Sequence, residues 1–382
     1  MTDIHHSEGW VRREDAPRLP PPPNMRGIKG WMLENLFSSP AHSLLTVVGA
    51  AFAVWVITYI GEWAIVDAVW TGTSREDCVA PAQQGLPLGA CWPFVWAKFP
   101  QWIYGFYPFD QRWRPTLVYI LFFALLIPLL APRIPFKRLN AILFFVAFPI
   151  LGWWLLYGGF GLPVVETSQW GGLLVTMVVA VTGIVASLPL GILLALGRRS
   201  KMPIVKFLSV VFIEVWRGVP LITVLFMASV MLPLFLPAGT SFDKLLRCLI
   251  GIALFSAAYM AEVVRGGLQA IPKGQYEGAM ALGISFWRMM LLIILPQALK
   301  IVIPGIVNSF ISLFKDTTLV LIIGIFDLLG IVGAGIADGN WASPQTGNTG
   351  YFAVAIMYWV FCFAMSRYSI YMEQRLHTGH RR

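Results

Sequence analysis

The sequence predicts an all-α polytopic membrane protein with about eight transmembrane helices. Hydrophobic residues make up 57% of the 382 residues and charged residues only 12%, whereas soluble domains carry about 25% charged residues. Several apolar runs reach the roughly 20 residues that a helix needs to cross a bilayer. Lys and Arg gather in the short segments between these runs, so the net charge of +9 is not the signature of a nucleic-acid surface.

The apolar runs give the expected spans in order. We expect them near residues 43–62, 115–131, 139–158, 170–196, 205–236, 246–266, 297–314 and 351–371. Residues 1–42 are polar and proline-rich and predict a cytoplasmic tail, with a proline-rich partner motif as the alternative. No cleavable signal peptide is expected, because the first apolar run begins only near Ser43. Residues 374–382 form a basic cytoplasmic tail.

The basic residues orient the chain. They occupy alternate connections and both ends: Arg12, Arg13, Arg18, Arg26, Lys29, Arg133, Lys137, Arg138, Arg198, Arg199, Lys201, Lys206, Arg265, Lys273, Arg288, Arg375, Arg381 and Arg382. With eight spans, all of them fall on one side, which the positive-inside rule makes cytoplasmic. Both termini are then inside, and the long loop 63–113 is outside.

A second outer segment, residues 315–350, has an apolar centre at residues 319–336 that is long enough to suggest a ninth span. Asp327 and four glycines in or near this centre argue against a helix that faces lipid. A ninth span would also move the basic C-terminus outside. We therefore expect a short or re-entrant segment packed against protein, with the ninth span as the alternative.

Four cysteines and five histidines limit the chemistry. Cys248 and Cys362 fall in apolar runs and are expected to be inert. Cys78 and Cys91 share the long outer loop, where a disulfide is allowed, but the sequence leaves open whether they pair. There is no CxxC pair or Cys/His cluster, so no metal site is expected. The histidines lie in or near the tails, so we expect no catalytic residues within the spans.

Charged residues within spans are functional candidates because they are costly there. Glu214 and Arg217 are spaced i, i+3 and predict either a structural ion pair or a site for the charged groups of a solute. Glu262 and Arg265 share this spacing near the cytoplasmic end of their span, and we expect a gating or structural pair. A further substrate-pathway candidate is the group Lys315, Asp316 and Thr317, for which helix capping is the alternative.

One cytoplasmic segment, about residues 275–288, carries a motif that runs into the next span. Its residues are Glu277, Gly278, Ala279, Gly283, Ile293, Leu295 and Pro296. This pattern resembles the EAA motif of binding-protein-dependent ABC importer permeases and departs from it only at Gly278, where the family has alanine. The resemblance implies a coupling helix that seats in a groove on a separate ATPase.

The flanking residues narrow the resemblance. The segments "IEVWRGVPLI", "SAAYMAEVVRGGLQAIPKGQYEGAMALG" and "LFKDTTLVLIIGI" are similar to permeases of the histidine/glutamine type. This likeness covers residues 167–373 and implies a five-helix type I importer core. Residues 43–160 form a three-span extension like that of the M-type permease of general L-amino-acid importers.

This family resemblance implies an inner-membrane permease subunit that moves L-amino acids into a bacterial cytoplasm. The implied partners are a second, homologous permease, an ATPase dimer that binds ATP and Mg, and a periplasmic amino-acid-binding protein. The chain itself has no phosphate-binding G-x-x-x-x-G-K-[ST] loop, so we expect no cofactor of its own and no enzymatic activity. A permease for another small polar solute, a secondary transporter and a membrane-embedded enzyme are the alternatives. Co-purification with an ATPase separates the importer from the last two.

Overall fold

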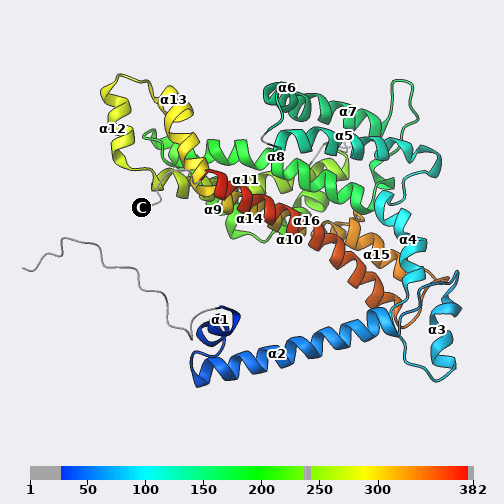
Figure 1. The fold of residues 1–382 in the computed structure, drawn as a ribbon. Coiled ribbons are helices and arrows are strands. Elements are labelled where there is room, and N and C mark those ends of the chain that lie inside the picture. The colour runs from blue at the N-terminus through cyan, green and yellow to red at the C-terminus, as the bar shows by residue number, and fades with distance from the viewer. Residues whose placement is uncertain (1–26, 132, 236, 238–241, 377–382) are drawn as a thin grey trace, which may run out of the picture. The chain divides into compact units, whose positions relative to one another are not determined.

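The computed structural model describes residues 27–131, 133–235, 237 and 242–376 (Figure 1). This part of the chain is helical, with three isolated bridges and no strand. The chain divides into two compact units, residues 1–67 and 68–382. The predicted tails, residues 1–42 and 374–382, lie largely outside the described residues.

The first unit contains α1 (Gly27–Asn35) and α2 (Pro40–Gly61), which continues as a π-helical turn over Glu62–Val66. Ser39 caps α2 by accepting a hydrogen bond from the His42 amide, and Pro40 occupies the first turn, where proline costs no hydrogen bond. The Thr46 hydroxyl donates to the Leu36 carbonyl at 2.7 Å and ties α1 to α2. Helix α2 is apolar along its length, and it buries no residue within its own unit.

The second unit contains fourteen labelled helices in its described part. They are α3 (Arg75–Gln83), α4 (Trp92–Tyr104), α5 (Trp113–Leu130), α6 (Lys137–Ile142), α7 (Phe148–Tyr157), α8 (Gly172–Arg198), α9 (Pro203–Gly218), α10 (Leu221–Phe226), α11 (Lys244–Ala270), α12 (Lys273–Ala281), α13 (Phe286–Met289), α14 (Leu295–Asp316), α15 (Leu328–Ile336) and α16 (Thr346–Leu376). Short π-helical turns cover Leu143–Ala147, Met227–Met231 and Met290–Ile294, and 3₁₀ turns cover Phe109–Gln111, Thr167–Gln169, Leu232–Phe235 and Thr317–Ile323.

The described helices confirm a polytopic membrane protein. Seven are long and apolar enough to cross a bilayer, and an eighth span results if one bent pair of helices counts as one. That pair is Pro203–Gly218 with Leu221–Phe235, bent by 101°. The predicted span over residues 205–236 is therefore not one continuous helix but two helices that meet at Val219 and Pro220. Pro220 lacks the amide hydrogen that would continue the helix and disfavours helical geometry at Val219, so the chain turns there.

Helices α8 and α11 run parallel, so the bent pair between them must carry the chain back to the end at which α8 starts. At their starts, the Thr167 hydroxyl donates to the Asp243 carboxylate. At their ends, the Tyr276 hydroxyl, just after α11, donates to the Leu268 carbonyl and accepts from Arg199, the residue after α8. The chain between α8 and α11 must therefore return along the full length of α8, about 40 Å for 27 residues.

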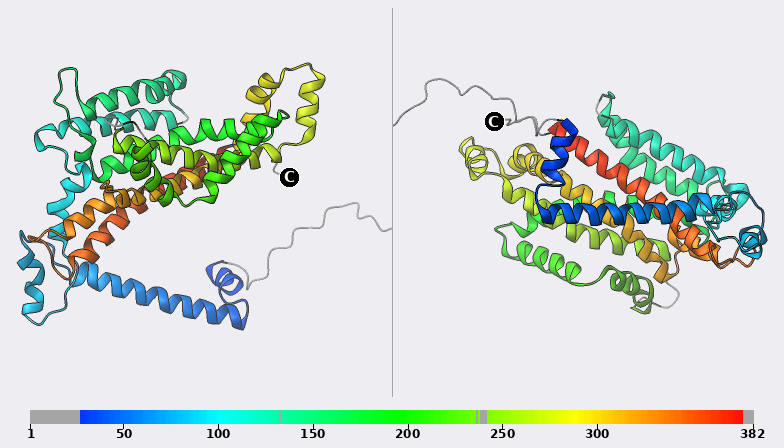
Figure 2. Two further views of the ribbon diagram at one scale, coloured as in Figure 1. Left: turned by 180° about the vertical axis from the view of Figure 1, so that it is seen from behind. Right: turned by 60° about the horizontal axis from the view of Figure 1, so that its bottom comes forward.

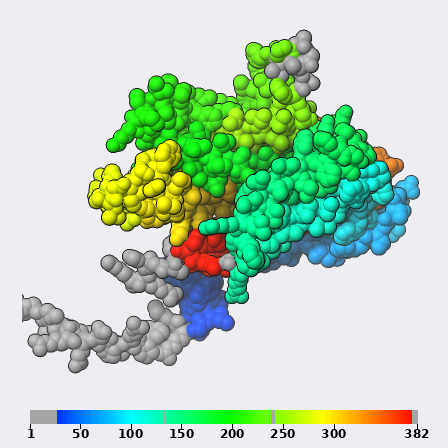
Figure 3. Space-filling model, turned by 90° about the horizontal axis from the view of Figure 1, so that it is seen from above, coloured from blue at the N-terminus to red at the C-terminus, as the bar shows by residue number. Residues whose placement is uncertain are grey.

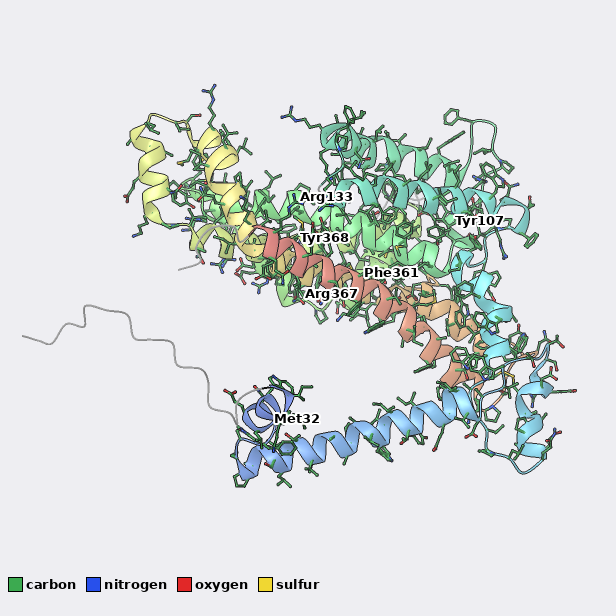
Figure 4. All side chains as sticks on the ribbon, in the orientation of Figure 1. Met32, Tyr107, Arg133, Phe361, Arg367 and Tyr368 are labelled. Atoms are coloured by element: carbon green, nitrogen blue, oxygen red, sulfur yellow. A yellow bond between two sulfur atoms is a disulfide. The ribbon has the colours of Figure 1, made fainter. Side chains whose placement is uncertain are left out.

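Different helices lie at the two ends of the second unit. At one end, α3 and α4 lie beside the start of α16 (Figures 1 and 2). We call this the cap end, after the segment of residues 68–112 described below. At the other, the α12 end, α12 and α13 extend beyond the neighbouring helices (Figure 1). Helix α16 joins the two ends, since the Tyr368 hydroxyl near its finish donates to the Leu130 carbonyl at the finish of α5 (Figure 4).

Residues 68–112, here called the cap, pack against residues 324–350. The Cys91 amide donates to the Thr349 hydroxyl at 2.9 Å, and Arg75 donates its amide to the Asn340 carbonyl at 3.1 Å. Lys98 forms an ion pair with Asp338. The compact unit thus begins at Ala68, whereas the predicted boundary between extension and core lies near residue 160.

Two close approaches fix the cap and α5 to the core. A Cβ atom on Gly105 would lie 2.3 Å from the Gly171 Cα atom, so the end of α4 reaches the start of α8 only because glycine stands there. Arg114, fully buried at the start of α5, donates to the Leu155 and Pro163 carbonyls, and the Tyr107 hydroxyl donates to Leu156 (Figure 4).

The segment after α14 contains no ninth span in the described residues. The 3₁₀ turn Thr317–Ile323 ends at Gly324, whose φ of +72° is left-handed. Asp327 then caps α15 by accepting from the Leu329 and Gly330 amides, and it also accepts from the Tyr358 hydroxyl. Helix α15 has 9 residues, about 14 Å, and is too short to cross a bilayer.

Candidate functional site

The α12 end carries a helical hairpin built from α12 and α13. Pro272 ends α11 and starts α12, and the chain reverses at Gly283, whose φ is +68°. Residues that bear a side chain rarely adopt this backbone conformation, so the turn itself requires glycine there. The π-helical turn Met290–Ile294 then leads into α14, with Pro296 in its first turn.

The motif residues of this hairpin divide between two faces. Ala279 and Leu295 are buried in an apolar cluster with Met289 and Ile294, and Ile293 packs against that cluster. Glu277, Gly278, Gly283 and Pro296 are exposed. Apolar side chains lie beside them on the outside, with Met280 59% and Leu282 80% exposed. The hairpin projects from the face shown in Figure 3, and most of its side chains are exposed among the described residues.

Polar contacts hold α12 on the core. Tyr276 is the main anchor, because its hydroxyl bonds both Leu268 and Arg199, at 3.1 Å each. The Arg199 guanidinium also lies over the Tyr276 ring, 5.6 Å from its centroid, which adds a cation–π contact. The Gln297 side chain donates to Gln275 at 3.2 Å and ties the start of α12 to α14.

A charge cluster lies beside this anchor. It contains Arg198, Glu214, Arg217, Glu262 and Arg265, from the ends of α8 and α9 and from α11. Glu262 is central, because three arginines reach it: Arg265 at 2.7 Å, Arg198 at 3.1 Å and Arg217 at 3.9 Å. Its side chain is 15% exposed, so these contacts are partly shielded from water.

The predicted pair Glu262–Arg265 forms. Of the two alternatives for Glu214 and Arg217, the ion pair between them is not among the contacts of the described residues, and the solute site stays a prediction. The Glu214 carboxylate instead accepts from Arg198 at 2.7 Å, because α9 lies across the end of α8. Arg217 lies 3.9 Å from Glu262 and 5.5 Å from the Tyr259 ring centroid. All four predicted residues therefore belong to one cluster at the α12 end.

The third set of candidates lies at the cap end of α14. Lys315 is exposed, Asp316 is half-buried and Thr317 is fully buried. The Thr317 hydroxyl donates to the Phe314 carbonyl at 2.8 Å, and Asp316 makes no capping hydrogen bond to the turn that follows. The suggested capping role of Asp316 is therefore not present.

Two cavities open between the spans, and both are lined mainly by apolar side chains. One, of about 560 Å³, lies between α9, α10 and α11 and includes Trp216 and Arg247. The other, of about 390 Å³, lies between α5, α7 and α8. Glu214, Arg217, Lys315, Asp316 and Thr317 line neither. Within the described residues, no group of three or more His, Cys, Asp or Glu side chains is placed to hold a metal.

The structure joins Cys78 and Cys91 as a disulfide with Cα atoms 5.5 Å apart. Both cysteines are buried in the cap, next to Phe94 and Trp341. Outside the spans, the Lys98 ammonium lowers the pKa of the Asp338 carboxyl below its usual value near 3.8. The cap is thus held by one covalent bond and by charge and apolar contacts to residues 324–350.

The spans define an integral membrane protein, and its α12 end carries an exposed helical hairpin. Comparison with known proteins identifies its class. The chain belongs to the family of binding-protein-dependent transport system inner membrane components, whose model matches residues 187–378. It is therefore a multi-pass inner-membrane protein, and the predicted family is confirmed.

Two relatives resemble nearly the whole chain. The inner membrane amino-acid ABC transporter permease protein YhdY of Escherichia coli is 53% identical over 351 residues, which covers 91% of this chain and 93% of YhdY. The glutamate/glutamine/aspartate/asparagine transport system permease protein BztC of Rhodobacter capsulatus is 42% identical, covering 97% of this chain and 99% of BztC. Both matches include the extension as well as the core.

A solved structure resembles about half of the chain. It is described as the crystal structure of an amino acid ABC transporter with histidines and is 29% identical to this chain. The match covers 53% of this chain and 92% of that chain, with a TM-score of 0.47.

Sequence reasoning missed three residues of the site. In the sequence, Arg198 and Arg199 are only loop charges that orient the chain, and nothing singles out Tyr276. The sequence does show that the two arginines follow an apolar run and that Tyr276 lies in the motif segment. Their partners, however, are 16 to 77 residues away along the chain. Only the fold brings these groups together.

Proposed function

We propose that this chain is a permease subunit that moves L-amino acids into the cytoplasm, driven by ATP hydrolysis in a separate subunit. The observation that carries the proposal is the α12–α13 hairpin. Its buried residues, Ala279 and Met289, fix it to the core, while Glu277, Gly278 and Gly283 are exposed beside exposed apolar side chains. An exposed apolar and charged helix tip is suited to a groove on a soluble partner.

The amino-acid substrate is supported by the relatives. Both full-length relatives carry amino-acid transport in their names, and BztC names glutamate, glutamine, aspartate and asparagine. The family name supplies the expectation of a binding protein that delivers the solute. ATP and Mg belong in this proposal to an ATPase dimer, and a second, homologous permease completes the membrane part.

The proposed orientation has the α12 end in the cytoplasm and the cap in the periplasm. Basic residues gather at the α12 end, which agrees with the positive-inside rule: Arg198 ends α8, Arg199 bonds Tyr276, and Lys273 and Arg288 lie in α12 and α13. The bent pair Pro203–Phe235 counts as one crossing, since α8 and α11 are parallel. With eight crossings, both termini are cytoplasmic.

The charge cluster around Glu262 is better suited to a cytoplasmic gate or packing lock than to a solute site. Its carboxylates and guanidiniums contact one another, so few charged atoms are left for a solute. Arg217 is the most loosely held member and stays a candidate for the pathway. Lys315, with its exposed side chain at the cap end, is a candidate for the entrance or for contact with the binding protein.

The test is reconstitution of the full assembly in vesicles. We expect the permease to co-purify with an ATPase and to take up labelled amino acids only when ATP and the loaded binding protein are both supplied. A panel of labelled acidic, amide, basic and apolar L-amino acids then defines the substrate range. Uptake that persists without the ATPase, driven by an ion gradient, would instead support a secondary transporter.

A further inference from the structure

The Tyr276 anchor and the Glu262 charge cluster are joined through two neighbouring arginines. Arg198 is the last residue of α8, and Arg199 is the residue that follows it. Arg198 bonds Glu214 at 2.7 Å and reaches Glu262 at 3.1 Å, whereas Arg199 bonds the Tyr276 hydroxyl at 3.1 Å. The end of α8 is thereby held on one side by α9 and α11 and on the other by the docking helix.

These contacts form a continuous polar path through the α12 end. Displacement of α12 moves Tyr276, and its hydroxyl is bonded to both α11 and the end of α8. A pull on Arg199 moves the end of α8, and Arg198 is attached to that end and to Glu262. Arg217 and Arg265 share the same Glu262 carboxylate, so a shift in one contact changes the others.

We propose that Tyr276 and Arg199 are positioning residues that transmit the movement of the ATPase-bound hairpin to the charge cluster around Glu262. This proposal rests on the proposed function, since it assigns a route to the coupling between ATP hydrolysis and transport. Tyr276 does not form part of the docking surface, whereas Arg199 is exposed and lies over the Tyr276 ring. Tyr276 is half-buried, and its hydroxyl is directed to Leu268 and Arg199 rather than outward.

Tyr276→Phe is the informative variant. It keeps the ring over which the Arg199 guanidinium lies and removes only the hydroxyl, so the hairpin keeps its apolar packing. Tyr368→Phe is the matched control, because it removes a similar hydroxyl bond, 3.2 Å to the Leu130 carbonyl, away from the docking helix. Arg199→Lys keeps a donor for the Tyr276 hydroxyl, whereas Arg199→Ala does not.

The experiment measures three quantities in the reconstituted assembly. They are the ATPase retained per permease, the ATP hydrolysed with and without loaded binding protein, and the amino acid transported per ATP. The labelled amino acid is the one that the wild-type assembly transports best. We expect Tyr276→Phe and Arg199→Ala to retain the ATPase and to lower transport per ATP about threefold or more, with partial recovery in Arg199→Lys. The double variant should be no worse than the worse single variant.

The outcomes separate the two proposals. A wild-type permease that retains no ATPase overturns the proposed function and the transmission route with it. If the wild type is coupled and Tyr276→Phe transports as much per ATP, the route is wrong while the function stands. The route is also wrong if Tyr368→Phe lowers transport per ATP as much as Tyr276→Phe does, or if the double variant shows the product of the single losses.

Discussion

At the scale of single residues, two glycines of the hairpin differ in what restricts substitution. Backbone conformation restricts one of them, and neither is restricted by space. Gly283 has a φ of +68°, and a Cβ atom added to it would meet no other atom within 4 Å, so backbone conformation restricts it and space does not. Gly278 is helical and equally open. Replacing glycine with alanine should therefore destabilise the hairpin at position 283 and stabilise α12 at position 278.

We expect Gly283→Ala to loosen the hairpin, because a left-handed residue with a side chain costs about 1–2 kcal/mol. Gly283→Leu should add bulk and further weaken ATPase retention, while membrane insertion stays normal. Gly278→Ala is the control and should stabilise α12 by up to about 1 kcal/mol. Retained ATPase per permease is the measurement. Full retention and uptake in Gly283→Leu would show that the hairpin does not dock as proposed.

The two glutamates of the charge cluster should also differ. The Glu214 side chain is 53% exposed and forms one ion pair among the described residues, so Glu214→Ala should cost about 0–1 kcal/mol. Glu262→Ala leaves three arginines without their shared carboxylate and should cost more, up to about 3 kcal/mol. Thermal unfolding of the purified permease in one detergent measures both. Equal shifts in Tm would contradict the central position of Glu262.

At the scale of helices, hydropathy predicts where the spans lie but not the contacts between residues that are far apart in the sequence. Windows of about 20 apolar residues locate the spans because crossing a bilayer requires that length. The break at Pro220 is larger than the sequence indicates, since a proline predicts a kink but not a 101° turn. The partner of Glu214 was missed because Arg198 lies on another helix, and the cap was missed because its contacts span up to 258 residues.

The cap should depend on its disulfide. We expect mass spectrometry of unreduced peptides to find Cys78 bonded to Cys91. Cys78→Ser should raise the rate of local opening in residues 68–112, because a crosslink of this kind contributes about 2–4 kcal/mol. Hydrogen exchange of the cap measures the opening, and residues of α11 serve as the internal reference. Two free thiols in protein purified without reductant would count against the bond.

Low pH should weaken the contact between the cap and residues 324–350. The pKa of Asp338 is lowered in the folded state by Lys98, so the stabilising contribution is present above the usual carboxyl pKa near 4. It is lost as the pH falls through the lower folded value. We expect limited proteolysis of residues 324–345 to increase below about pH 4 in the wild type and to show less of this dependence in Lys98→Met. An identical acid response in both would contradict the role of the pair.

At the scale of the whole molecule, the proposed eight crossings determine which surface meets which compartment. We expect single introduced cysteines in the cap, such as at Gln84, to react with an impermeant reagent in intact cells. A cysteine at position 278 should react only after the membrane is opened. Labelling of position 278 from outside would reverse the orientation and remove the hairpin from the ATPase.

The cap also constrains the order in which the chain reaches its final structure. Its partners Asp338 and Thr349 are 240 and 258 residues after Lys98 and Cys91. During synthesis the N-terminal segments leave the ribosome first, yet residues 68–112 cannot complete their packing until residues 324–350 have been made and inserted. The cap is therefore among the last segments to complete its packing, although it is made early. A nascent chain that ends before residue 338 would leave the buried face of the cap open to proteases.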